Sequence, residues 1–185
     1  RLIEAAGGFY ERQGRTPEAR ALYTRAQTQY PESILLPDAL ARLGRAPAPA
    51  LFVDSVERGL AEAMFDVASA LRRENSGQNA LVYARLGEAL APSAPIMLLL
   101  VGETLEGLGQ REAANAIYER IDPSAPAGYP AQLRLAENLH GLGKTDEAIG
   151  RLEALASRYP ERPEPLVSLG VVLRLKERFA EAAAA

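Results

Sequence analysis

Apolar residues recur along this chain at intervals of three and four positions, which places them on one face of an α-helix. Val67 and Leu71 form one such pair, and Leu135 and Leu139 form another. The amphipathic stretches occur in pairs, the two members of a pair are joined by a short glycine-containing or polar turn, and proline follows each pair. This alternation predicts an all-α fold built from antiparallel helix pairs.

The helix pairs repeat with a fixed period, because five sets of equivalent positions recur at one and the same interval. The sets are Ala80/Ala114/Ala148/Ala182, Pro92/Pro126/Pro160, Ala68/Gly102/Ala136/Gly170, Val67/Val101/Leu135/Leu169 and Leu71/Leu105/Leu139/Leu173. The large apolar residues form the packing face of the first helix, and the small residues beside them allow the second helix to approach closely. Gly109 and Gly143 suit the positive φ of a tight turn. Thr145, followed by two acidic residues, predicts a helix N-cap.

These positions together resemble the tetratricopeptide repeat, a 34-residue helix–turn–helix unit. Residues 1–32 fit the same pattern, with Thr16 predicted as an N-cap before Pro17. The matching positions there are Gly7, Tyr10, Gly14, Ala19, Tyr23, Ala26 and Pro31. The resemblance implies a right-handed superhelical solenoid that forms one domain. Its expected repeats span 1–32, 61–94, 95–128 and 129–162, with a truncated repeat at 163–185.

Residues 33–60 interrupt the period, because the step from the first repeat to the second is longer than one period and shorter than two. Residues 34–43 predict a short helix that ends at Gly44, and residues 46–50 alternate alanine with proline and predict an extended connector. Asp54 with Glu57 resembles a capping box that opens a helix running through Gly59. We favour a degenerate helix pair, since a continuous solenoid cannot leave a repeat face uncovered. An insertion that forms a kink or hinge is the alternative.

The composition of the chain limits its chemistry. Its 185 residues are 48% hydrophobic, enough for a folded core, and it has no cysteine and one histidine. A disulfide framework, a thiolate zinc site and a multi-histidine metal site are therefore excluded. A net charge of −3 gives no general field for nucleic acid or anionic membrane. The longest apolar run, residues 96–101, is too short to span a bilayer. We expect no cofactor and no membrane insertion.

Two patterns that suggest catalysis have simpler explanations. Residues 141–145 resemble the tail of a phosphate-binding loop, but Asn138 stands where that motif requires glycine, and a predicted helix precedes it instead of a strand. His140 has no triad partner nearby, so an exposed histidine on the first helix of its pair is favoured over a role in ligand contact, and Glu137 lies one turn away as a possible surface partner. Paired acids such as Glu103 and Glu106 are expected to be solvated. We therefore expect no enzymatic activity.

The resemblance also implies a binding surface, the inner groove lined by the first helix of each pair. The residues carried over to it are Phe65, Arg72, Arg73, Ile96, Leu99, Leu100, Glu103, Leu133, Arg134, Glu137, His140, Val167, Val171 and Arg174. Family members that grip chaperone tails use a Lys, Arg and Asn clamp here, which this chain lacks. Its asparagine places hold Gly8, Ser69, Glu103, Glu137 and Val171.

The groove is expected to have an exposed apolar floor, because the helix around residues 96–101 is apolar on all sides. That floor consists of Ile96, Leu99 and Leu100 with Phe65, Leu133 and Val167. Arg72, Arg73 and Arg134 at its edge either select an acidic flank or are ordinary solvated charges.

We therefore expect a non-enzymatic scaffold that binds a peptide or helix segment of a protein partner in this groove, and no nucleic acid. The alternative is a structural module of a larger enzyme or export complex, with its groove covered intramolecularly or by self-association. Because the chain starts at Arg1 and stops as a helix begins, we expect a fragment of a longer protein. The alanine- and arginine-rich composition is typical of GC-rich bacteria. A soluble protein of the cytoplasm or periplasm is expected.

Overall fold

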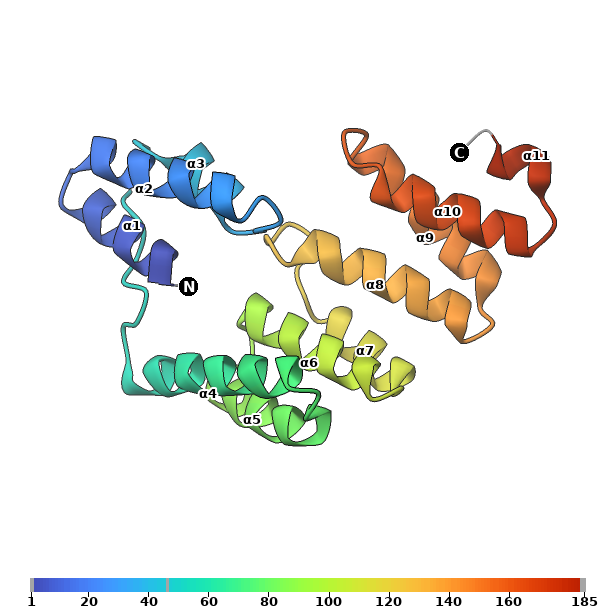
Figure 1. The fold of residues 1–185 in the computed structure, drawn as a ribbon, viewed down its shortest axis with the longest axis horizontal. Helices are drawn as coiled ribbons and strands as arrows, with labels where there is room; N and C mark the ends of the chain where they lie inside the picture. Colours follow the sequence, from blue (N-terminus) through green and yellow to red (C-terminus); the bar gives the residue numbers. More distant parts are fainter. Residues whose placement is uncertain (1, 46, 184–185) are drawn as a thin grey trace. The chain divides into compact units, whose positions relative to one another are not determined.

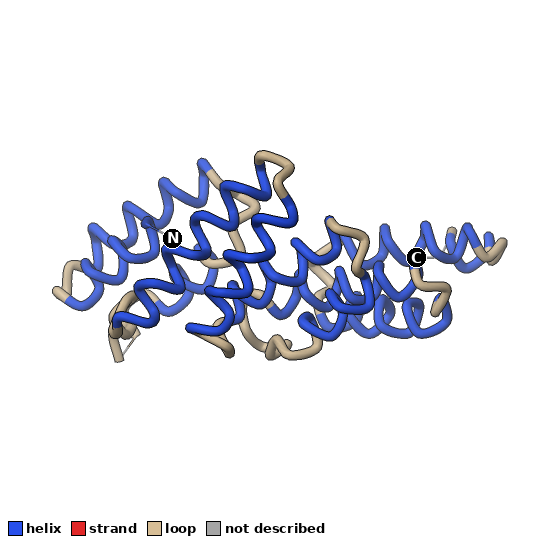
Figure 2. Tube along the Cα trace, turned by 90° about the horizontal axis from the view of Figure 1, so that it is seen from below, coloured by secondary structure: helices blue, strands red, loops and turns tan. Residues whose placement is uncertain are grey.

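The computed structural model describes residues 2–45 and 47–183, and the regular elements in those ranges are all α-helices, as predicted (Figure 1). The helices are α1 (Leu2–Arg12), α2 (Thr16–Gln29), α3 (Leu36–Arg42), α4 (Val56–Arg73), α5 (Gly77–Leu90), α6 (Pro95–Gly107), α7 (Arg111–Tyr118), α8 (Gly128–Gly141), α9 (Thr145–Arg158), α10 (Glu164–Leu175) and α11 (Phe179–Ala182). Figure 2 shows the short loops between them. The chain divides into two compact units, Arg1–Leu60 and Ala61–Ala185. The expected repeat boundaries, and their union in one domain, stay predictions.

In the first unit, α2 packs against both α1 and α3. Its core is made of six buried residues: Ala19, Tyr23, Ala26, Leu36, Ala39 and Leu43. Gly7 leaves room for the ring of Tyr23, since a Cβ atom at Gly7 would lie 2.2 Å from Tyr23 Cε1. The Tyr23 hydroxyl donates to Glu11 Oε1 (2.8 Å), and Arg42 of α3 pairs with the same oxygen at 3.2 Å. Burial, together with Glu11, raises the pKa of Tyr23 to about 12.

The segment between the two units matches part of its prediction. Helix α3 falls within residues 34–43, Gly44 has a φ of 80°, and α4 runs through Gly59. Residues 47–55 contain no helix, since prolines fix φ and remove donors, so the described part supplies one short helix and not a complete pair. Ala46, the start of the expected connector, lies outside the described residues. The cap assignment was wrong: Ser55 Oγ accepts from Arg58 N (3.2 Å), while Asp54 pairs with the Arg58 side chain (2.9 Å).

In the second unit, each of α6 and α9 packs against the helix before it and the helix after it. Of the eight predicted small residues, Gly102 is buried, Gly170 and Ala182 at the end of the chain are partly buried, and the other five are fully buried: Ala68, Ala80, Ala114, Ala136 and Ala148. At Gly102 a Cβ atom would lie 2.2 Å from the ring of Tyr118, so glycine is required there. The expected reason for the small-residue series, close approach of two helices, is confirmed.

The turns between the helices of a pair keep one backbone conformation. Gly14, Gly109 and Gly143 have positive φ, as predicted for Gly109 and Gly143. Asn75 (φ 58°) lies one repeat before Gly109, Glu177 (φ 59°) lies one repeat after Gly143, and both adopt the same conformation. The sequence did not reveal these two, because neither is glycine. The turn geometry therefore follows the repeat and not the residue type.

The predicted threonine N-caps were wrong. Helices α2 and α9 begin at Thr16 and Thr145, so that Arg15 and Lys144 occupy the cap positions without any side-chain cap hydrogen bond. Thr145 is buried, and its Oγ1 lies 3.3 Å from His140 Nδ1. Its hydroxyl is thus directed to the preceding helix and not to the first turn of its own.

Candidate functional site

A hollow of about 440 Å³ is lined by the first helices of three successive pairs, α6, α8 and α10. Figure 1 labels these three helices. Its lining residues are Glu103, Tyr129, Pro130, Leu133, Arg134, Glu137, Pro163, Glu164, Val167 and Ser168. Five of them were expected in the groove: Glu103, Leu133, Arg134, Glu137 and Val167. The structure therefore brings these five together from three helices, and we take this hollow as the candidate site.

The accessible apolar surface of the groove lies on α8 and α10. Val167 is 65% exposed and Val171 is 45% exposed, while Leu133 is partly buried beside them in the lining. We call Leu133, Val167 and Val171 the apolar strip. Isolated apolar residues on a surface are ordinary, but Leu133 and Val167 line one hollow and Val171 lies one helical turn after Val167 on α10, so together they indicate a contact surface.

The expected groove floor on α6 was wrong. Leu99 and Leu100 are only 8% and 4% exposed, and Ile96 is half-buried. Helix α6 packs against both α5 and α7, so its all-round apolar surface is used inside the protein. A substitution of Leu99 or Leu100 consequently tests folding and not binding.

Two of the three arginines expected at the edge of the groove, Arg72 and Arg134, are paired with carboxylates of neighbouring helices. Arg72 lies 3.1 Å from Glu103, across from α4 to α6. Arg134 of α8 lies 3.5 Å from Glu106 of α6 and 3.8 Å from Glu137. An acidic partner would have to displace these pairs. Of the two expectations for these arginines, selection of an acidic flank is therefore the less favoured.

Two carboxylates of the hollow are held by hydroxyl donors. Ser168 Oγ donates to Glu137 Oε1 (2.9 Å), and the Tyr129 hydroxyl donates to Glu164 Oε2 (3.1 Å). Burial, and then the bond to Glu164, raises the pKa of Tyr129 to about 12, so this donor keeps its proton at neutral pH. The rims of the hollow on α8 and α10 are thus fixed before any partner arrives.

Aromatic and guanidinium groups fix Tyr129 itself. Its ring meets that of Tyr159 edge to face, with centroids 5.0 Å apart, and the Arg162 guanidinium lies 4.3 Å from the Tyr129 ring centre. Sequence reasoning missed Tyr129, Pro130, Pro163 and Glu164, because they lie at the starts of helices, outside the positions carried over from the family. The tyrosine and arginines clustered at residues 158–162 were the sequence feature that could have indicated a contact with Tyr129.

The remaining expected groove residues do not line the hollow. They are Phe65, Arg72, Arg73, Ile96, Leu99, Leu100, His140, Val171 and Arg174. His140, expected to be exposed, is half-buried, and its Nδ1 lies 3.3 Å from Thr145 Oγ1. Residues 142–144 connect helix α8 to helix α9, as the sequence indicated, and do not form a phosphate loop after a strand.

The described residues contain no group of three or more His, Cys, Asp or Glu that is arranged to hold a metal ion. Within the same ranges, no helix combines the length and the apolar character needed to cross a membrane.

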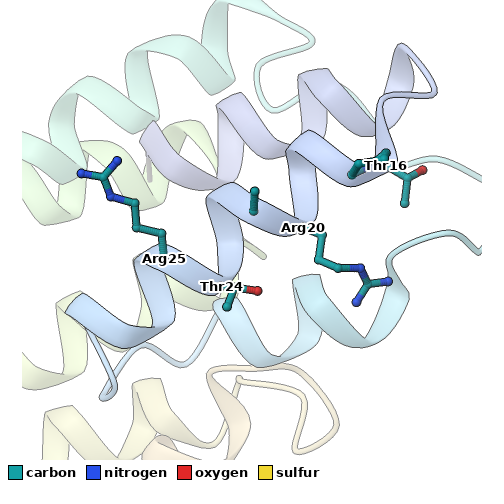
Figure 3. A pocket seen from close by; sticks show the side chains of 6 residues that line it. Thr16, Arg20, Thr24 and Arg25 are labelled. Carbon is teal, nitrogen blue, oxygen red and sulfur yellow. The ribbon is translucent and has the colours of Figure 1, made fainter.

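A second hollow of about 640 Å³ lies in the first unit and is lined by α2 alone. Its lining residues are Thr16, Pro17, Arg20, Ala21, Thr24 and Arg25. Figure 3 shows Arg20 and Arg25 projecting toward different sides of this helix. One exposed helix face does not enclose a ligand, so this hollow is the weaker candidate.

Comparisons with known proteins agree with the helix-pair architecture. A family model described as tetratricopeptide repeat matches residues 133–185, and another with the same description matches residues 6–33. Among solved structures, MamA of MSR-1 is similar with a TM-score of 0.58 and 15% identity over 97% of this chain and 88% of that one. MamA from Desulfovibrio magneticus RS-1 is similar with a TM-score of 0.61 and 18% identity over 89% of each chain.

Pseudomonas aeruginosa PilF is similar with a TM-score of 0.58 and 18% identity, over 69% of this chain and 59% of that chain. A search of curated proteins found no significant match. At these identities the structural likeness shows the fold, and the predicted tetratricopeptide-type all-α fold class is confirmed.

Proposed function

We propose that this chain, which belongs to the tetratricopeptide repeat family of protein-interaction scaffolds, binds a peptide or helical segment of a partner protein in the hollow between α6, α8 and α10. The observation that carries this proposal is the apolar strip, whose most exposed member, Val167, is 65% open to solvent inside a hollow lined by three helices. An exposed apolar surface of this kind is typical of an interaction site.

The rigidity of the hollow also supports binding. Ser168 and Tyr129 fix the carboxylates of Glu137 and Glu164, and a preformed surface loses little conformational entropy when a partner docks. The volume of about 440 Å³ falls within the range of ordinary ligand pockets. We propose further that the chain is bacterial, as the relatives from Pseudomonas and Desulfovibrio favour, and that it has no enzymatic activity of its own.

A second candidate is a structural module whose groove is covered by another part of the protein or by a second copy. The observation that favours it is a further exposed apolar pair near the end of the chain, Leu175 and Phe179, each 63% exposed. Under this alternative the apolar residues of α10 and α11 form a packing surface and not a recognition surface.

A peptide selection tests the first candidate. Random peptides displayed on phage are selected on the immobilised chain and then scored on Val167→Asp, which places a charge in the apolar strip. Val82→Asp is the matched control, because Val82 is 58% exposed on α5 and does not line the hollow. We expect peptides that bind the wild type and Val82→Asp but not Val167→Asp. A selection without such peptides would favour the structural module.

A further inference from the structure

We infer that the segment bound in the hollow is basic and amphipathic, with apolar side chains that cover the apolar strip and lysine or arginine side chains that meet Glu137 and Glu164. The inference rests on the proposed function and adds the charge of the partner to it. It reverses the sequence-based idea that the groove arginines select an acidic flank.

The charges that line the hollow are mostly negative. Glu103, Glu137 and Glu164 stand against one cation, Arg134. Arg72, the partner of Glu103, and Glu106, the partner of Arg134, add one charge of each sign, so the net charge around the hollow stays at −2. Arg162, on the ring of Tyr129, reduces this to −1. Arg134 and Arg72 are already paired with carboxylates, so an incoming carboxylate would meet more negative than positive charge.

The two carboxylates that would meet the partner flank the apolar strip. Glu137 lies one helical turn after Leu133 on α8, and Glu164 lies one turn before Val167 on α10. A partner helix that covers the apolar strip would therefore have a carboxylate of α8 on one side and a carboxylate of α10 on the other. This is the arrangement that an apolar face with basic flanks complements.

Both carboxylates retain acceptor capacity for such a partner. The side chain of Glu137 is 38% exposed, and its Oε2 has only a long contact of 3.8 Å with Arg134. The Tyr129 hydroxyl occupies Oε2 of Glu164, and in the described part of the chain no donor reaches Oε1. Each carboxylate can thus accept a charge-assisted hydrogen bond without losing its present donor.

The test uses three synthetic peptides of about 18 residues, long enough to form a helix in isolation. They share one leucine face and carry lysine, glutamine or glutamate on the flanks, and fluorescence anisotropy measures their affinity for the whole chain. We expect the lysine peptide to bind about tenfold more tightly than the glutamate peptide. The difference should shrink at 0.5 M salt, because screening shortens the range of these charges.

Variants locate the effect. Glu137→Gln and Glu164→Gln should each weaken the lysine peptide about two- to fivefold and leave the glutamine peptide unchanged. Glu112→Gln and Glu153→Gln are controls with the same change in net charge at exposed positions outside the hollow, and they should have no effect. Circular dichroism checks that every variant keeps its helical content.

The outcomes separate the inference from the proposed function. Equal affinity of the three peptides, with loss of all of them in Val167→Asp, overturns the charge inference and leaves the groove as a binding site. Tightest binding by the glutamate peptide, or no binding of the lysine peptide at 1 mM, also overturns the inference, and the displayed-peptide selection then decides the function alone. Lysine-peptide binding that survives Val167→Asp overturns the inference, because the peptide then binds elsewhere.

Discussion

The helix pairs α6–α7 and α8–α9 have different residues packed at equivalent positions of the repeat. In the first pair Gly102 lies against the ring of Tyr118, whose hydroxyl donates to Glu106 Oε2 at 2.9 Å. At the equivalent positions one repeat later, the second pair has Ala136 and Leu152, both fully buried, and His140. One pair combines the smallest residue with a large polar-tipped ring, and the other combines two apolar residues of medium and small size.

The difference lies in how each solution connects to its neighbours. Glu106 also accepts a hydrogen bond from Asn138 (3.4 Å), and Asn138 donates to Asn115 Oδ1 at 3.1 Å. Asn138 and Asn115 are 3% and 9% exposed, so the asparagine end of this network is buried, while the Glu106 side chain is 23% exposed. At the equivalent place in α8–α9, Ala136 and Leu152 stabilise the contact through dispersion and the burial of apolar surface. The glycine–tyrosine solution therefore adds a polar link between successive helix pairs, which the alanine–leucine solution lacks.

The largest expected loss of stability comes from a substitution in the pair Ala136 and Leu152. Leu152→Ala should lower the free energy of unfolding by about 3 kcal/mol, because Leu152 is fully buried and its truncation leaves a cavity. Urea unfolding followed by circular dichroism measures it. A loss below about 1 kcal/mol would mean that this position is not a packing centre.

The next effect tests the glycine of the other pair. Gly102→Ala should cost about 2 kcal/mol, since the new Cβ atom would lie 2.2 Å from Tyr118 Cε1 and must move the ring. Ala136→Gly is the reciprocal control and should cost about 1–2 kcal/mol, through helix propensity and the loss of a buried methyl group. If Gly102→Ala were stabilising, propensity would outweigh packing, and the comparison would be broken.

Tyr118→Phe sharpens the comparison by removing only the polar link. We expect a loss of about 1 kcal/mol at neutral pH, because Glu106 keeps its other donors. Burial and nearby Glu106 raise the pKa of Tyr118 above its ordinary value near 10, so the folded state favours the neutral phenol. Stability from this group is complete below pH 10 and is lost as the pH rises above it.

The wild type should therefore lose stability more steeply than Tyr118→Phe above pH 10. The measurement is the urea midpoint as a function of pH between about 9 and 11, where the unfolded phenol begins to ionise. Parallel curves for the two proteins would show that the hydroxyl is as well solvated in the folded state as in the unfolded one.

The smallest expected effect concerns the shared turn. Glu177 adopts a φ of 59°, which costs a non-glycine residue about 1 kcal/mol. Glu177→Gly should therefore raise the free energy of unfolding by about 0.5 kcal/mol, after the greater freedom of glycine in the unfolded chain is subtracted. Thermal unfolding measures it, and destabilisation would contradict the view that the repeat imposes this turn.

The sequence predicted the parts of the fold that one helix pair determines locally. The regular spacing of small residues identified the helix contacts, and Gly109 and Gly143 identified the turns, because each requires a particular residue type. Asn75 and Glu177 escaped notice, since the packed helices impose the same turn on residues that do not favour it.

The candidate site was less predictable, because it depends on contacts between different helix pairs. Periodicity could not show that α6 is surrounded, so Leu99 and Leu100 were placed on the surface. Arg72 and Arg134 each pair with a carboxylate of a neighbouring helix pair, and the pattern of a single helix does not reveal such a partner. Leu133, Arg134, Glu137 and Val167 were found because the family resemblance supplied the register.

The most direct test of the central claim is the affinity of the lysine-flanked amphipathic peptide for three proteins: the wild type, Val167→Asp and Val82→Asp. We expect equal binding to the wild type and Val82→Asp, and at least about a tenfold loss in Val167→Asp, since one buried apolar contact is worth roughly 1.5 kcal/mol or more. Equal binding to all three proteins would contradict the claim that the hollow between α6, α8 and α10 is the binding site.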